Sequence, residues 1–237
     1  MTITLPTAAA DAVPPWIEGW LRGVPSRPLT ELIPNPAAAG VFSADMIPAF
    51  LSVGNLASAR VGALAGPVAD LFRRAHAYGV RRFVLLQDTH DPRTPEFEAW
   101  PPHAVRGTEE STTIPELRAL PFAADFTTIK KNSLNPAIGT GFDRWLDDHP
   151  ELLTALVVGN CTDLCVYQLA MHLRLRANAR NLDGVRVIVP ADAVETFDLP
   201  SEAAAATGAF AHHGDFFHKV FLYHLALNGV EVVRTLT

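Results

Sequence analysis

The chain has 237 residues, a length that suits one large α/β domain with a buried core. Hydrophobic residues make up 49% of it and charged residues 19%, a balance typical of a globular protein and not of a disordered one. The formal net charge of −6 argues against nucleic acid or an anionic membrane as the main partner. The sequence has no apolar run of about 18 residues, which a transmembrane helix needs, and its first residues do not resemble a signal peptide. We therefore expect a cytoplasmic protein.

Residues 1–38 are rich in proline and alanine, which predicts an N-terminal arm with one short helix, followed by a single domain at 39–237. Within that domain, short apolar runs alternate with segments of helical periodicity. The strands are predicted at 40–44, 82–87, 126–129, 153–158, 185–189 and 230–233, and the helices at 58–78, 142–148, 164–177 and 218–227. This alternation predicts an α/β fold with a doubly wound, mainly parallel sheet of about six strands and helices on both faces.

Four residues with reactive or charged side chains lie at or just after the ends of predicted strands: Asp45, Asp88, Lys131 and Cys165. In a parallel sheet the carboxyl ends of the strands meet at one edge, and ligands bind there. Charged residues also occupy loops for no catalytic reason, so one such residue alone would be weak evidence. Four together predict a functional site at this edge.

Cys165 has the sequence context of a nucleophile. The segment VVGNCTDLCVYQLA (157–170) predicts a strand, a tight turn and a helix with Cys165 in its first turn. A helix N-terminus lowers the pKa of a thiol, and its free N–H groups can hold an oxyanion. A thiolate nucleophile also needs a base and a cation, which Asp45 and Lys131 could supply. The alternative is a buried, inert Cys165 beside a solvated Lys131, and spacing alone leaves both interpretations open.

A second group of residues has the chemistry of a metal site. Asp88 and His90 form an Asp-x-His pair at a strand end, and His103 follows thirteen residues after His90. One carboxylate and two imidazoles suit zinc, or iron or manganese. Three such residues in a loop are, however, more often solvated surface groups. The residues alone therefore do not decide whether a metal binds.

Three segments together are similar to motifs of the isochorismatase-like cysteine hydrolases. GNCTDLCV (159–166) resembles the sequence around the family's nucleophilic cysteine, and VFSADMIPAF (41–50) resembles the strand that ends in its catalytic aspartate. IKKNSLNPAIGT (129–140) resembles the family's lysine motif, in which the distance to the Gly-Thr pair selects Lys131. The resemblance runs from about residue 38 to the C-terminus, with aspartate, lysine and cysteine in the family's order. It implies the family's α/β fold and a cysteine-dependent hydrolase.

The resemblance also implies a mechanism for amide cleavage. Asp45 would take the thiol proton, Lys131 would favour the charged pair, and Cys165 would attack the amide carbonyl to give a thioester that water hydrolyses. The Asn160–Cys161 peptide bond would be cis, and the backbone N–H groups of Cys161 and Cys165 would form the oxyanion hole. Isochorismatases proper do not use a cysteine nucleophile, so Cys165 argues against that activity.

Within the family, the metal-site segment resembles that of nicotinamidases. The Asp-x-His pair is followed by WPPHAVRGT (100–108), which is similar to their metal-binding motif. This resemblance implies that Asp88, His90 and His103 bind a divalent metal, which holds the pyridine nitrogen of nicotinamide. Glu96 occupies the place of a fourth ligand that some nicotinamidases have. Nicotinamide is therefore the substrate that we expect.

Two aromatic residues, Phe50 and Trp100, match positions that sandwich the pyridine ring in nicotinamidases, although ordinary core packing is the alternative for both. The chain departs from the family pattern at Ala104, Glu109, Asn135 and Ala137. The substrate alternatives are another amide or carbamoyl group, and a further alternative is a catalytically silent protein that binds a small molecule. Relatives commonly form dimers or tetramers, so we also expect a homo-oligomer.

Overall fold

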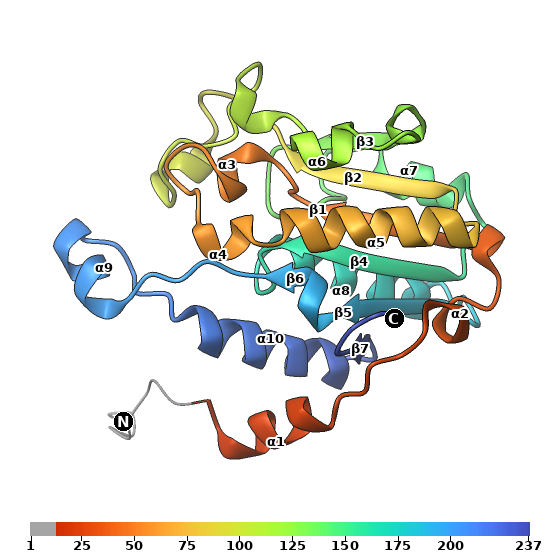
Figure 1. Cartoon of the computed structure of the whole chain (residues 1–237). Helices are drawn as coiled ribbons and strands as arrows, with labels where there is room; N and C mark the ends of the chain where they lie inside the picture. Colours follow the sequence, from red (N-terminus) through yellow and green to blue (C-terminus); the bar gives the residue numbers. More distant parts are fainter. Residues whose placement is uncertain (1–12) are drawn as a thin grey trace.

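The computed structural model describes residues 13–237, and a parallel β-sheet forms its centre (Figure 1). The strand order is β3-β2-β1-β4-β5-β7, with β6 paired to β4, and every pairing in this sheet is parallel. The strands are β1 Ala39–Ala44, β2 Arg82–Asp88, β3 Thr127–Lys131, β4 Thr154–Asn160, β5 Arg186–Pro190, β6 Val194–Glu195 and β7 Glu231–Val233. The predicted doubly wound sheet is confirmed. The structure has one strand more than the six that we expected. This strand is β6, whose two residues are too few to form an apolar run that could be recognised in the sequence.

Helices connect the strands and cover both faces of the sheet (Figure 1). The α-helices are α1 Pro15–Gly23, α2 Leu29–Leu32, α3 Pro48–Leu51, α4 Ala59–Gly62, α5 Ala65–Tyr78, α6 Pro115–Arg118, α7 Phe142–Asp147, α8 Cys165–Ala179, α9 Ser201–Thr207 and α10 Gly214–Leu227. Short 3₁₀ turns lie at η1 Pro36–Ala38, η2 Pro95–Glu98, η3 Glu109–Ser111, η4 Ala123–Asp125 and η5 Ala191–Ala193. None of the helices within residues 13–237 combines the length and the apolar character that a membrane span requires.

The single helix predicted at 58–78 is wrong in one respect, because the structure divides it into α4 and α5. Pro67 lies in the first turn of α5, where its missing N–H costs nothing. One continuous helix would place Pro67 in its interior, where proline removes a hydrogen bond and clashes with the preceding turn. The predicted end of this helix is confirmed, since Gly79 is a left-handed C-cap with φ 117°.

The N-terminal segment packs on the domain through aromatic side chains. Trp16 and Trp20 of α1 contact Tyr223 of α10 edge-on, at centroid distances of 4.8 and 5.3 Å. Residues 1–12 of the predicted arm lie outside the described residues. The division into an arm and a single domain at 39–237 remains a prediction.

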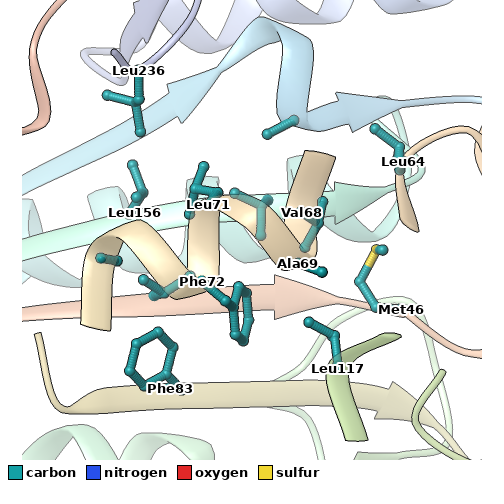
Figure 2. Close-up of a cluster of buried hydrophobic side chains, with 14 of the residues drawn as sticks. Met46, Leu64, Val68, Ala69, Leu71, Phe72, Phe83, Leu117, Leu156 and Leu236 are labelled. Atoms are coloured by element: carbon teal, nitrogen blue, oxygen red, sulfur yellow. The ribbon is translucent and has the colours of Figure 1, made fainter. Parts of the chain in front are cut away.

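One face of the sheet is covered by α5 (Figure 2). Val68, Leu71 and Phe72 of this helix are buried in a cluster with Phe83 of β2 and Leu156 of β4. The rings of Phe72 and Phe83 lie 5.0 Å apart between centroids. Successive side chains of a strand point to opposite faces, so each strand also supplies residues to a second core on the other side.

That second core lies beneath α7, α8 and α10. Phe42 of β1 contacts Phe142 and Trp145 of α7 at centroid distances of 6.0 and 5.7 Å. Val166 and Leu169 of α8 are fully buried in the same cluster. Because both faces of the central strands are buried, these strands form the continuous apolar runs that made them visible in the sequence.

At Gly159, β4 approaches β1 more closely than a side chain would allow. Gly159 pairs with Ala44 and has a φ of 106°. A Cβ atom at this position would lie 2.1 Å from the carbonyl oxygen of Ala44. Asp45 and Asn160 directly follow these two residues, so Gly159 brings the ends of the two strands together where the candidate site lies.

We expect Gly159→Ala to lower the free energy of unfolding by about 3 kcal/mol, because a side chain there is both strained and in collision with backbone. Gly184→Ala is the matched control, since Gly184 has a φ of 74° and no heavy atom near its would-be Cβ. It should cost only about 1 kcal/mol. Urea unfolding measures both variants. Equal losses would contradict the close approach of β4 to β1.

Candidate active site

The structure brings Asp45, Lys131 and Cys165 together at the carboxyl edge of the sheet. Asp45 follows β1, Lys131 ends β3, and Cys165 begins α8. The Lys131 Nζ atom lies 2.8 Å from Asp45 Oδ2 and donates a hydrogen bond of 3.4 Å to Cys165 Sγ. The three residues are 0%, 2% and 4% exposed. A thiol, a carboxylate and a cation therefore share one buried site.

Lys131 also forms an ion pair with Asp88, whose Oδ1 lies 2.5 Å from its Nζ. Burial alone would lower the pKa of Lys131, but the carboxylates of Asp45 and Asp88 outweigh it and hold that pKa well above its ordinary value. The ammonium is therefore permanently charged. It compensates two carboxylates that could not otherwise be buried side by side.

The two carboxylates differ in proton affinity. Burial, followed by repulsion from Asp88, raises the pKa of Asp45 to about 6, although Lys131 opposes the shift. Burial would also raise the pKa of Asp88, but Lys131 and His90 outweigh it and lower that pKa below its usual value. Paired acids whose pKa values are pushed apart have different roles. Asp45 is the group that can accept and release a proton near neutral pH, while Asp88 stays ionised.

The expected low pKa of the Cys165 thiol is wrong. Burial, reinforced by the charge of Asp45, raises its pKa well above the ordinary value and outweighs the attraction of Lys131. The position at the start of α8 is as expected, but the thiol there is desolvated. It is therefore protonated at rest and must lose its proton as it reacts. The carboxylate of Asp45 is the adjacent group with the chemistry to accept that proton.

The segment before Cys165 is held to the Asp45 loop by Asn160. The Asn160 Nδ2 atom donates a 2.7 Å hydrogen bond to the carbonyl oxygen of Asp45, whose φ of 49° lies in the left-handed region. The Asn160–Cys161 peptide bond is cis, as the family resemblance implies. Burial raises the pKa of the Cys161 thiol to about 12, so this side chain is inert. Among the backbone hydrogen bonds that turns, loops and helix caps make in the described part of the chain, none has the N–H group of Cys161 or of Cys165 as its donor.

The candidate metal residues also converge. One ligand atom from each of Asp88, His90 and His103 lies within 4.8 Å of the others, and all three side chains are buried. The His90 Nε2 atom is 3.6 Å from Asp88 Oδ2 and 3.7 Å from Oε1 of Glu96, which lies on η2. Three of the four residues predicted from the sequence therefore converge beside Lys131, and Glu96 lies next to His90.

Buried atoms without partners test whether these residues suit a metal ion. Asp88 Oδ2, His90 Nε2 and Glu96 Oε1 are buried, and none has a hydrogen-bond partner among the described residues. The Nδ1 atom of His103 lies 2.8 Å from the carbonyl oxygen of Pro101, which leaves its Nε2 atom for a ligand. Unpaired buried polar atoms are costly, and a divalent cation would satisfy all of them together. The residues fit such an ion.

The two predicted pocket aromatics lie in different surroundings. Phe50 is half-buried on α3, with its ring 5.5 Å from that of His103 between centroids. Trp100 is half-buried and contacts Phe197 edge-on at 6.1 Å. Phe50 therefore borders the candidate metal residues. Contact of either ring with a substrate stays a prediction.

Two contacts in the site were not predicted from the sequence: a second contact of Asp88, and the contact of Asn160 with Asp45. Asp88 was predicted only as a metal ligand, yet it also pairs with Lys131, so one carboxylate joins the two halves of the site. Asp88 and Lys131 are register partners at the ends of neighbouring strands. An alignment of the two strand ends could have suggested this ion pair. The same kind of alignment could have suggested the contact of Asn160, because Asn160 and Asp45 directly follow the register partners Gly159 and Ala44.

The fold and the site together define an α/β protein with a buried thiol, carboxylate and ammonium group at the carboxyl edge of its sheet. The family model described as the isochorismatase domain matches residues 39–217, which is most of the chain. The chain therefore belongs to the isochorismatase family.

Among curated proteins, Nicotinamidase 1 from Arabidopsis thaliana is 28% identical over 220 residues, covering 87% of this chain and 89% of that protein. A solved N-carbamoylsarcosine amidase from Thermoplasma acidophilum has a TM-score of 0.63 at 24% identity, covering 83% and 95% of the two chains. A pyrazinamidase of Pyrococcus horikoshii in complex with zinc has a TM-score of 0.64 at 19% identity, covering 83% and 99%. These structures share the fold.

The raised pKa of the Cys165 thiol predicts slow alkylation by iodoacetamide at neutral pH, because only the thiolate reacts. The rate should increase steadily as the pH is raised from 7 towards 9. Peptide mass spectrometry of wild type and Cys165→Ser assigns the label to Cys165 or Cys161. A rate that is already maximal below pH 7 would reveal a preformed thiolate and contradict the electrostatics described above.

Proposed function

We propose that this protein is a cysteine-dependent amidohydrolase that converts nicotinamide to nicotinate and ammonia through a thioester. The observation that carries the proposal is a buried thiol in contact with Lys131, next to a carboxyl of raised pKa and beside the unpaired donors of a metal site. Membership of the isochorismatase family supports a hydrolase, and Nicotinamidase 1 supports the carboxamide substrate.

In the first half of the reaction, Asp45 accepts the proton of the Cys165 thiol while the sulfur attacks the carboxamide carbon. Lys131 stabilises the negative charge that moves between the sulfur and the carboxylate, since it contacts both groups. The carbonyl oxygen becomes an oxyanion, and the backbone N–H groups of Cys161 and Cys165 donate to it. When the C–N bond breaks, the nitrogen takes the proton from Asp45 and leaves as ammonia.

The second half repeats the proton transfers with water in place of the thiol. Asp45 is ionised again, so it accepts a proton from a water molecule that attacks the thioester carbon. The C–S bond breaks and the sulfur recovers the proton from Asp45. The nicotinic acid that forms loses its remaining proton to solvent and leaves as nicotinate. A carboxyl with a pKa of about 6 suits both directions of transfer near neutral pH.

Asp88, His90, His103 and Glu96 would hold the divalent metal. When bound, this ion supplies a Lewis-acid contact for the pyridine nitrogen and so orients the ring. Zinc is our first choice, because one carboxylate and two imidazoles suit it and the pyrazinamidase of Pyrococcus horikoshii is a zinc complex. Phe50, beside His103, and Trp100 would flank the ring.

Ammonia release from nicotinamide tests the proposal directly. Wild type should release ammonia, and Cys165→Ala should lose the activity by at least about 1,000-fold, because no other nucleophile replaces the thiol. His172→Ala is the fold control, since His172 lies further along α8 and pairs with Asp143. No release from a protein whose Cys165 alkylates as expected would refute nicotinamide as the substrate, and the next substrates would be other small amides and carbamoyl compounds.

The raised pKa of Asp45 predicts the acid limb of the pH profile. Asp45 must be ionised to accept the thiol proton, and that form is lost as the pH falls through about 6. Below this pH, kcat/KM should fall about tenfold per pH unit. Metal content measured at each pH separates this effect from loss of the ion. A profile that stays flat to pH 4.5 would indicate an ordinary aspartate and contradict the assignment of the base.

The metal site predicts which variants keep the ion. His103→Ala should reduce the zinc in purified protein to background, because it removes one of two imidazole ligands. Cys165→Ala should keep it, since the thiol lies outside the set of Asp88, His90 and His103. Elemental analysis by mass spectrometry measures all three proteins. Equal zinc in wild type and His103→Ala would contradict the predicted ligands.

A further inference from the structure

Asn132 connects the strand that carries Lys131 to the loop that carries His90. It directly follows Lys131 at the end of β3. Its Oδ1 atom accepts a 2.9 Å hydrogen bond from the backbone N–H of Asp91 and lies 3.3 Å from Nδ1 of His90. No step of the proposed mechanism uses this residue.

The contact with Asp91 fixes which way the Asn132 amide faces. A backbone N–H can only donate, so the group beside it must be the oxygen of the amide and not its nitrogen. The same oxygen faces His90, and an oxygen can only accept. The Nδ1 atom of His90 must therefore carry the hydrogen, which leaves the lone pair of a neutral ring on Nε2.

The Nε2 atom of His90 is the one that faces the candidate metal site. It is buried, has no hydrogen-bond partner among the described residues, and lies 3.6 Å from Asp88 Oδ2. The other imidazole is presented in the same way, because the Nδ1 atom of His103 contacts the carbonyl oxygen of Pro101. In each ring, Nδ1 thus faces an oxygen acceptor, and Nε2 is the nitrogen that remains for the metal ion.

The backbone of His90 is already held without Asn132. Its N–H donates to the carbonyl oxygen of Ala104 at 2.9 Å, and its own carbonyl accepts from Arg106 at 2.9 Å. These bonds place the Cα atom beside the His103 loop, and the rings of Phe97 and His103 pack edge-on against the His90 ring. None of these contacts sets the tautomer of the ring. The Oδ1 atom of Asn132 is the acceptor that faces Nδ1 and so sets it.

We propose that Asn132 is a positioning residue for the metal site, which fixes the tautomer of His90 so that Nε2 coordinates the ion. The proposal rests on the metal site of the proposed function. Outer-shell partners of this kind are worth 10- to 100-fold in metal affinity. Because Asn132 is exposed to solvent, we expect a loss near tenfold.

The test measures zinc affinity by competition with a chromophoric chelator, on the full chain stripped of metal. Asn132→Ala should bind zinc about tenfold more weakly than wild type. Asn132→Asp should restore the affinity, because its carboxylate keeps an acceptor for both donors. Asn135→Ala is the matched control and should bind as wild type does, since the contacts of Asn135 are with Ala137 and Gln168.

A second measurement reads the tautomer without metal. In the metal-free wild type, ¹⁵N NMR of the histidine rings should show His90 protonated on Nδ1, with its signals assigned from a His90→Gln variant. Asn132→Ala should shift these signals towards a mixture of tautomers, whereas Asn135→Ala should leave them unchanged. A general loss of structure would alter the signals of all the histidines, so this readout is specific.

The failure of Asn132 and the failure of the metal site are distinguishable. Zinc bound equally well by wild type and Asn132→Ala, with the His90 tautomer unchanged, would overturn the role of Asn132 and leave the proposed function intact. If wild type and His90→Gln both fail to bind zinc, the metal site itself fails, and the proposal for Asn132 falls with it.

Discussion

The site depends on one buried ammonium group held between two buried carboxylates. Lys131 contacts Asp45 and Asp88, which come from two different strands, and it also contacts Cys165. Burying three charges is tolerated only where each has a partner, so the ends of β1, β2 and β3 must meet with little freedom. Gly159 permits the corresponding approach of β4 to β1. The buried charges can therefore be paired only if the strand ends meet at this edge of the sheet.

This arrangement gives the two carboxylates different chemistry. Asp45 has a pKa of about 6 and can move a proton, while the lowered pKa of Asp88 keeps it ionised between Lys131 and His90. Asp88 consequently belongs to both halves of the site. In the proposed mechanism the thiol of Cys165, whose pKa is raised, reacts only when a base and a polarised carbonyl are both beside it. A thiol that is protonated at rest is also less readily oxidised, because oxidants react with the thiolate form.

The sequence predicted what depends on local pattern. Continuous apolar strands and their polar ends placed Asp45, Lys131 and Cys165 at one edge, and the structure brings them together there. Prediction from the sequence failed for properties that depend on residues brought together from distant parts of the chain. The position of Cys165 at a helix start predicted a low thiol pKa, but burial beside Asp45 reverses it. The contact of Asn132 with the His90 loop likewise depends on the turn after β3, which leaves no periodic signal.

The proposed mechanism requires that the Cys165 sulfur becomes acylated. Wild type mixed with nicotinamide and quenched in acid within the first turnovers should carry a nicotinoyl group, detected by peptide mass spectrometry. We expect that group on Cys165 itself, with Cys161 unmodified and no adduct in Cys165→Ala. Ammonia release accompanied by an adduct on another residue, or by an active Cys165→Ala variant, would contradict it.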